Sequence, residues 1–225
     1  MKSALNSVSP FMWTIFALTS ALWIFYPQID LDVASFFYTP HEGFTQKNLW
    51  WEYLLYESVA VLLIGFNVGA LLFWLYQHYF LKIKDSFSKK RFLFALLVLS
   101  IGSGLIVNAM LKENWGRARP GDIVQFGGER DFTPAFVLSD QKGNSFSSGH
   151  ASGAFALIAF ALLTHRRRHF WLTLAIVYGA AVGYARMAAG GHFLSDVVVS
   201  FFIMYITAKM LHAYIFESGD MIKTD

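Results

Sequence analysis

The stretch Arg186-Met-Ala-Ala-Gly-Gly-His192-Phe-Leu-Ser-Asp196 joins two apolar segments and places three polar side chains between them. In a helix, His192 and Asp196 lie four residues apart on one face, where the carboxylate can orient the imidazole. Gly190 and Gly191 predict a helix break, so we expect His192 to open a new helix whose amino end attracts anions. Arg186, before the break, is a planar cation suited to phosphate. An oriented nucleophile or base and a polar clamp between helices both fit this stretch alone.

The composition indicates an integral membrane protein. The 225 residues are 56% hydrophobic and 18% aromatic, with a mean hydropathy of +0.45, which is too apolar for an ordinary soluble domain. The chain has no cysteine, which excludes disulfides, a thiolate nucleophile and Cys-based metal sites. The net charge of +3 comes from short basic clusters between apolar runs, a pattern that does not favour nucleic acid binding.

Six apolar segments predict an all-α bundle of six transmembrane helices that forms a single membrane domain over residues 1–225. The expected spans cover residues 11–26, 53–80, 92–111, 151–164, 170–189 and 195–215. The first segment ends in bulky residues at 24–27 and offers no small-residue cleavage site, so we expect an uncleaved span rather than a signal peptide.

Two basic clusters predict the orientation of the bundle. The connection between the second and third spans carries Lys82, Lys84, Lys89, Lys90 and Arg91, and residues 165–169 read His-Arg-Arg-Arg-His. Basic loops stay in the cytoplasm, so both clusters and both termini are expected there. The polar loop 112–149 and the turn 190–195 then share the outer face.

A second polar stretch begins where the third span ends and reads Lys112-Glu-Asn-Trp-Gly-Arg117-Ala-Arg119-Pro120. Lys112 and Arg119 are seven residues apart, two helical turns, so both can point at one anion, and Pro120 then turns the chain away from the helix. The alternative is a set of lipid headgroup anchors. We interpret Arg117 as such an anchor.

A third polar stretch, Ser145-Phe-Ser-Ser-Gly-His150, precedes the fourth span. Ser147 or Ser148 can cap that helix, whose free amides then form a second anion cradle. An ordinary capped helix with His150 at the interface is the alternative. The small residues at 151–154 predict close helix packing.

Together the three stretches supply the groups for phosphoryl transfer without a metal. Each lies at the outer end of a different span. Cations and helix amides would neutralise the phosphoryl oxygens. His192 would attack phosphorus as a neutral imidazole, and His150 would protonate the leaving oxygen and later activate water.

These stretches resemble the three signatures of the type 2 phosphatidic acid phosphatase superfamily, also called lipid phosphate phosphatases. The signatures appear here as Lys112-x6-Arg119-Pro120, Ser147-Ser148-Gly149-His150 and Ala185-Arg186-x5-His192-x3-Asp196. The resemblance implies a six-helix membrane fold and a metal-independent, cofactor-free phosphatase that works through a phosphohistidine. It also implies site roles: Lys112, Arg119, Ser148, Gly149 and Arg186 bind phosphate, His150 is the acid, His192 the nucleophile and Asp196 its orienting group. Ser147 replaces the usual proline, and Ala185 replaces the usual serine.

Residues 115–123 and 132–136 are in addition similar to bacterial members that act on lipid A at its 1-phosphate. The first expectation is therefore a multi-pass lipid phosphatase of the bacterial inner membrane, with lipid A 1-phosphate as substrate and the site facing the periplasm. Phosphatidylglycerol phosphate and undecaprenyl pyrophosphate are rival substrates. We expect the loop 112–149 to select the headgroup, and we expect no partner beyond the lipid and the bilayer.

Other functions stay open at this point. A lipid phosphotransferase would use the same phosphohistidine, while membrane spans disfavour a vanadate-dependent haloperoxidase. A transporter or scaffold is disfavoured because the charges gather at one interface instead of running through the spans. His192 and Asp196 could supply two metal ligands, but the surrounding cations would repel a metal ion.

Overall fold

The computed structural model describes residues 5–82 and 86–217. Among these residues, the regular elements are helices, with isolated bridges but no strand. The elements are α2 (Pro10–Phe25), α3 (Gln28–Ser35), α4 (Trp50–Tyr79), α5 (Ser86–Leu97), η1 (Val98–Lys112), η2 (Pro120–Asp122), η3 (Val124–Phe126), α6 (Gly149–Phe155), α7 (Ile158–Leu163), α8 (Arg168–Ala188), α9 (Leu194–His212) and η4 (Ala213–Glu217). The expected all-α class is confirmed.

Four helices in the described ranges are long and apolar enough to cross a membrane: Trp50–Tyr79, Lys89–Lys112, Arg168–Ala188 and Leu194–Phe216. They match the expected second, third, fifth and sixth spans. The expected first span is α2, which has 16 residues and is followed by α3 after a bend of 85°. The expected fourth span is a short apolar helix, Gly149–Leu163, divided into α6 and α7.

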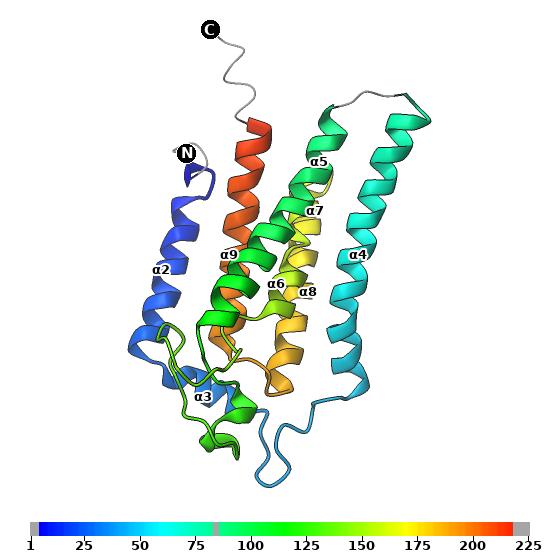
Figure 1. Cartoon of the computed structure of the whole chain (residues 1–225). Coiled ribbons are helices and arrows are strands. Elements are labelled where there is room, and N and C mark those ends of the chain that lie inside the picture. Colours follow the sequence, from blue (N-terminus) through cyan, green and yellow to red (C-terminus); the bar gives the residue numbers. More distant parts are fainter. Residues whose placement is uncertain (1–4, 83–85, 218–225) are drawn as a thin grey trace.

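The bundle has two distinct ends (Figure 1). The start of α2, the end of α4, the start of α5, the turn from α7 to α8 and the carboxyl end of α9 lie at one end. The other end holds α3, the polar loop after η1 and the turn from α8 to α9. Both basic clusters are therefore at the end opposite the three polar stretches; Lys84 of the first cluster lies outside the described residues.

The core lies around α6 and α7, which pack against α8, α9 and η1. Phe94, Val98, Phe155, Ile158 and Met204 belong to one buried cluster that joins these elements. Residues 151–154 are all buried, as the run of small side chains predicts, because they let neighbouring helix backbones approach closely.

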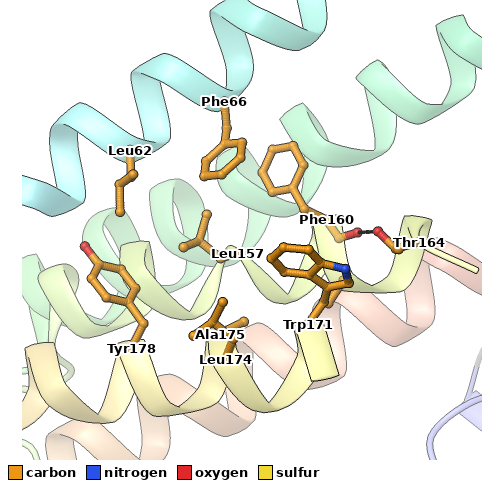
Figure 2. Close-up of a pocket in the computed structure, with 10 residues that line it drawn as sticks. Leu62, Phe66, Leu157, Phe160, Thr164, Trp171, Leu174, Ala175 and Tyr178 are labelled. Carbon is orange, nitrogen blue, oxygen red and sulfur yellow. Dashed lines mark hydrogen bonds between the residues drawn. The ribbon is translucent and has the colours of Figure 1, made fainter. Parts of the chain in front are cut away.

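A cavity of about 460 Å³ lies between α4, α7 and α8 (Figure 2). Its walls are mostly apolar, and the two hydroxyl groups among them are already paired. Tyr178 shares a 2.7 Å hydrogen bond with Ser58, and Thr164 donates to the carbonyl of Phe160 at 3.0 Å. Because its lining residues include no charged or nucleophilic group beyond these paired hydroxyls, this cavity is not a candidate catalytic site.

Candidate active site

His192 lies in the turn between α8 and α9. Gly190 has a positive φ of 68°, a backbone conformation that favours glycine and ends α8. Phe193 is extended and caps α9, and its backbone N–H donates to the carboxylate of Asp196 at 2.8 Å. The helix therefore begins at Leu194, two residues after His192, and the expectation that His192 opens it is wrong.

The imidazole of His192 is oriented by a backbone carbonyl. Nδ1 lies 2.8 Å from the carbonyl oxygen of Ser145 and 3.5 Å from Oδ2 of Asp196. Since a carbonyl only accepts hydrogen bonds, Nδ1 carries the proton and the lone pair of the neutral ring is on Nε2. The ring is 3% exposed, and this burial lowers the pKa of His192, although Asp196 opposes the shift. The neutral form is therefore favoured.

Asp196 is fully buried and held by several donors. The hydroxyl of Ser145 donates to Oδ2 at 2.6 Å, in addition to the N–H of Phe193. Arg117 donates from Nη1 to Oδ1. Asp196 thus fixes the α9 end of the site, while the hydrogen bond that orients His192 comes from Ser145.

Arg117 is a site residue that sequence reasoning misplaced. It is 0% exposed, so its interpretation as a headgroup anchor is wrong. Besides Asp196, the guanidinium donates to Asp30 at 2.8 Å and, through Nε, to the carbonyl of Thr133 at 2.8 Å. It also lies 4.3 Å from the centre of the Phe193 ring, a cation–π distance.

Asp30 on α3 completes this group. It is 1% exposed and accepts hydrogen bonds from the backbone N–H and the hydroxyl of Ser195. Asp30, Arg117, Ser145, Ser195 and Asp196 are called the buried network below. No local spacing pattern links these residues, because Arg117 is 87 residues from Asp30 and 79 from Asp196.

His150 lies near the start of α6. Ser148 caps this helix by accepting from the N–H of Ala151 at 3.3 Å, as one of the two expected caps. The imidazole of His150 stacks on Tyr56 of α4, with 3.9 Å between ring centres. Gly149 is in close contact with η1, because a Cβ there would lie 2.7 Å from Oδ1 of Asn108.

Three partly buried cations converge near His150 from separate elements. Lys112 ends η1, Arg119 precedes η2 and Arg186 lies in the last turn of α8. Each of them interacts electrostatically with His150, and so does His192. The structure therefore brings the predicted residues together. Lys112, Arg119 and Arg186 are called the cation rim below.

Two members of the cation rim, and Ser147 before α6, retain unused hydrogen-bonding capacity. Nε of Arg119, Nε of Arg186 and the hydroxyl of Ser147 are buried without a partner among the residues that the structure describes. Arg186 is bound through Nη1 to Glu52 at 2.6 Å and lies over the Tyr56 ring. Neither Glu52 nor Tyr56 was singled out from the sequence; their spacing of four residues on an apolar helix was the available signal.

These contacts define the class: a multi-pass helical membrane protein with a cation-rich site at one end of its bundle. A profile of the PAP2 superfamily matches residues 93–220. The chain is 34% identical over 213 residues to lipid A 4'-phosphatase of Francisella tularensis subsp. novicida (strain U112), covering 88% of this chain and 92% of that protein. The chain belongs to the PAP2 superfamily, and it is a phosphatase that acts on lipid phosphate substrates.

Two further relatives match about half of the chain. Lipid A 4'-phosphatase of Rhizobium leguminosarum is 36% identical over 108 residues, covering 47% of this chain and 46% of its own length. Phosphatidylglycerophosphatase B of Bacillus subtilis (strain 168) is 31% identical over 114 residues, covering 47% of this chain and 50% of its own length. No solved structure matches the chain significantly.

Proposed function

We propose that this protein removes the 4'-phosphate of lipid A. The observation that carries the proposal is the 34% identity to a lipid A 4'-phosphatase over 88% of the chain. Residues 115–123 and 132–136 favoured the 1-phosphate as substrate, and the relatives named for the 4'-position lead us to propose the 4'-phosphate instead. Phosphatidylglycerol phosphate is the second candidate, because phosphatidylglycerophosphatase B also matches.

In the proposed first step, Nε2 of His192 attacks phosphorus. A nitrogen–phosphorus bond forms, the phosphorus–oxygen bond to the lipid breaks, and His150 protonates the departing lipid oxygen. The hydrogen bond from Nδ1 to Ser145 supports this assignment, since it leaves the Nε2 lone pair available. A neutral imidazole also brings no negative charge toward an anionic phosphate.

In the second step, water attacks the phosphohistidine while His150 accepts its proton. The nitrogen–phosphorus bond breaks, inorganic phosphate leaves and His192 returns to its neutral form. We assign the three cations of the rim to the phosphoryl oxygens, where fixed positive charge stabilises the transition state. Ser148 and Gly149 are the further phosphate ligands; the Ser148 hydroxyl accepts from Ala151 and can still donate its proton.

We further propose a six-span topology in the bacterial inner membrane, with both termini cytoplasmic and the site facing the periplasm. The separation of the basic clusters from the site, at opposite ends of the bundle, supports this orientation (Figure 1). The whole chain, 1–225, then forms one membrane domain. The short helix Gly149–Leu163 is the fourth span; its 15 residues reach about 22 Å, so we expect His150 to lie below the membrane surface, where a lipid phosphate arrives laterally.

The loop 112–149 is our candidate for headgroup selection. It carries Lys112 and Arg119 of the rim and is anchored to the buried network through Arg117. Exchanging this loop with that of a phosphatidylglycerol phosphate phosphatase is expected to transfer substrate preference, and an unchanged preference would contradict this assignment.

The direct test is phosphate release by purified protein in detergent with EDTA present. Doubly phosphorylated lipid A and phosphatidylglycerol phosphate are offered separately, and mass spectrometry identifies the remaining lipid. We expect free phosphate and lipid A that retains only its 1-phosphate. Loss of the 1-phosphate, preference for phosphatidylglycerol phosphate, transfer of phosphate to a second lipid, or inhibition by EDTA would each contradict a stated part of the proposal.

A further inference from the structure

We propose that Arg117 and Asp30 are positioning residues that hold the nucleophile His192 through the buried network. The inference rests on the proposed function, in which His192 attacks phosphorus. Asp30 lies on α3, outside residues 93–220 that match the superfamily. The amino-terminal helices α2 and α3 would thus be part of the catalytic apparatus as well as of the membrane bundle.

The first argument is a closed ring of hydrogen bonds around His192. The carbonyl of Arg117 accepts from the N–H of Ser145 at 3.0 Å. Ser145 in turn binds the imidazole through its carbonyl at 2.8 Å and Asp196 through its hydroxyl at 2.6 Å. The side chain of Arg117 closes the ring at Asp196. One arginine therefore fixes both the carbonyl that orients the ring and the carboxylate beside it.

Asp30 is in addition attached to the start of α9. The N–H of Ser195 donates to Oδ1 of Asp30 at 2.9 Å, so Asp30 satisfies one of the free amides at this helix terminus. Arg117 reaches Asp30 at 2.8 Å and also donates to the Ser195 hydroxyl at 2.8 Å. The position of α9, and with it the turn that carries His192, is tied to α3.

The buried network also acts on His192 through the charges of its side chains. One guanidinium lies between two carboxylates, and all three side chains are at most 1% exposed, so solvent screens their interactions weakly. The groups that face His192 from the packed elements are Asp196 from α9, Arg186 from α8, Arg119 from the loop and His150 from α6. Asp30 and Arg117 act on His192 through Asp196.

Two single substitutions are therefore expected to move the pKa of His192 in opposite directions. Arg117→Met leaves two buried carboxylates without their cation, and the added negative potential favours the imidazolium. Asp30→Asn leaves Asp196 as the only charged partner of Arg117. The negative potential at His192 is then reduced, which disfavours the imidazolium. In Arg117→Met/Asp30→Asn the net charge of the network returns to that of the wild type.

The experiment measures kcat and KM for lipid A, and the pH dependence of kcat/KM, on wild type, the two single variants and the double variant. Arg166→Met and Asp32→Asn are the control substitutions of the same types, because both side chains are exposed and lie outside the loop 112–149 and the buried network. We expect Arg117→Met to lower kcat about 10²-fold, as a slightly displaced reacting group does, with KM within about twofold of wild type. The double variant should be more active than Arg117→Met.

The pH profile separates positioning from general structural damage. The acid limb of kcat/KM should move to higher pH in Arg117→Met and to lower pH in Asp30→Asn, with the controls unmoved. Unshifted limbs, or a double variant no better than Arg117→Met, would overturn the inference. If Arg117→Met does not fold in detergent, the acid limb of Asp30→Asn is the test. A shift to lower pH supports the inference, and a shift to higher pH or no shift overturns it. A wild-type protein that releases no phosphate would instead overturn the proposed function, and this inference with it.

Discussion

The buried network and the cation rim contain similar charged groups in opposite states. In the network, Arg117, Asp30 and Asp196 are almost completely buried, and the described contacts pair each of them with several donors or acceptors. In the rim, Arg119 and Arg186 keep a buried Nε without a partner among the described residues. The charged groups of the buried network already have protein partners, whereas the cation rim has N–H donors available for an anion.

The two regions therefore have different roles in the proposed site. Saturated buried charges cannot bind a substrate without losing existing partners, which is costly in a low-dielectric interior. Unused donors at the rim can bind phosphate without such a loss. We therefore expect substitutions in the network to act mainly on kcat, and substitutions in the rim to act on substrate binding and kcat together.

The largest effect is expected for the residue between the two regions. His192→Ala removes the proposed nucleophile and should reduce phosphate release about 10⁴-fold or more, as removal of a covalent nucleophile does in other hydrolases. Phosphate release from lipid A measures this. His165→Ala, an exposed histidine in the basic turn, is the matched control and should keep wild-type activity. Comparable rates for the two variants would exclude a nucleophilic role.

The next effect is expected in the cation rim. Arg119→Met and Arg186→Met each remove a positive charge at the proposed phosphate site, and kcat/KM should fall about 10²- to 10³-fold with a raised KM. Arg166→Met, exposed at the opposite end of the bundle, is the control. Normal KM values in both rim variants would remove the distinction between rim and network.

A smaller effect is expected on thermal stability when inorganic phosphate binds without turnover. Inorganic phosphate should stabilise the wild type against thermal unfolding, by about 2.7 kcal/mol at one hundred times its dissociation constant. Arg119→Met should lose most of this stabilisation because it lacks a rim donor, while Asp30→Asn should keep it. Equal stabilisation of all three proteins would place the phosphate somewhere other than the rim.

The smallest effect is expected in the pH dependence of wild-type activity and stability. Burial lowers the pKa of His192 below its ordinary 6.5, although Asp196 opposes the shift. Attack requires the neutral ring, so kcat/KM should stay high through pH 6.5 and fall only at lower pH. The corresponding stability is present above pH 6.5 and lost as pH falls toward the lowered pKa, because the unfolded chain then binds the extra proton. An acid limb above pH 6.5, measured on the wild type, would contradict this.

The sequence predicts the local parts of this molecule well. Apolar runs predicted four of the long helices to within a few residues, and residue type restricted the cap of α6 to Ser147 or Ser148, of which the structure shows Ser148. The convergence of Lys112, Arg186 and His150 was predicted from topology and from the superfamily signatures, which place them at one end of the bundle.

The buried network was not predicted, for a physical reason. Hydrophobic periodicity reports neighbours three or four residues apart, whereas Asp30 and Arg117 meet across 87 residues. Asp30 lies between the expected first and second spans, where no spacing pattern distinguishes it, and it contacts the start of α9 only because of the 85° bend after α2. The orientation of His192 by the Ser145 carbonyl is likewise a tertiary contact that side-chain identity does not encode.

Attack by His192 on phosphorus can be tested by a search for the phosphohistidine. Purified wild type, His192→Ala and His165→Ala are mixed with lipid A carrying ³²P at the 4'-position and quenched rapidly in alkali, in which phosphohistidine survives. We predict protein-bound label that is lost on acid treatment in the wild type and in His165→Ala, and none in His192→Ala. Label that persists in His192→Ala, or turnover by the wild type without any protein-bound label, would contradict attack by His192.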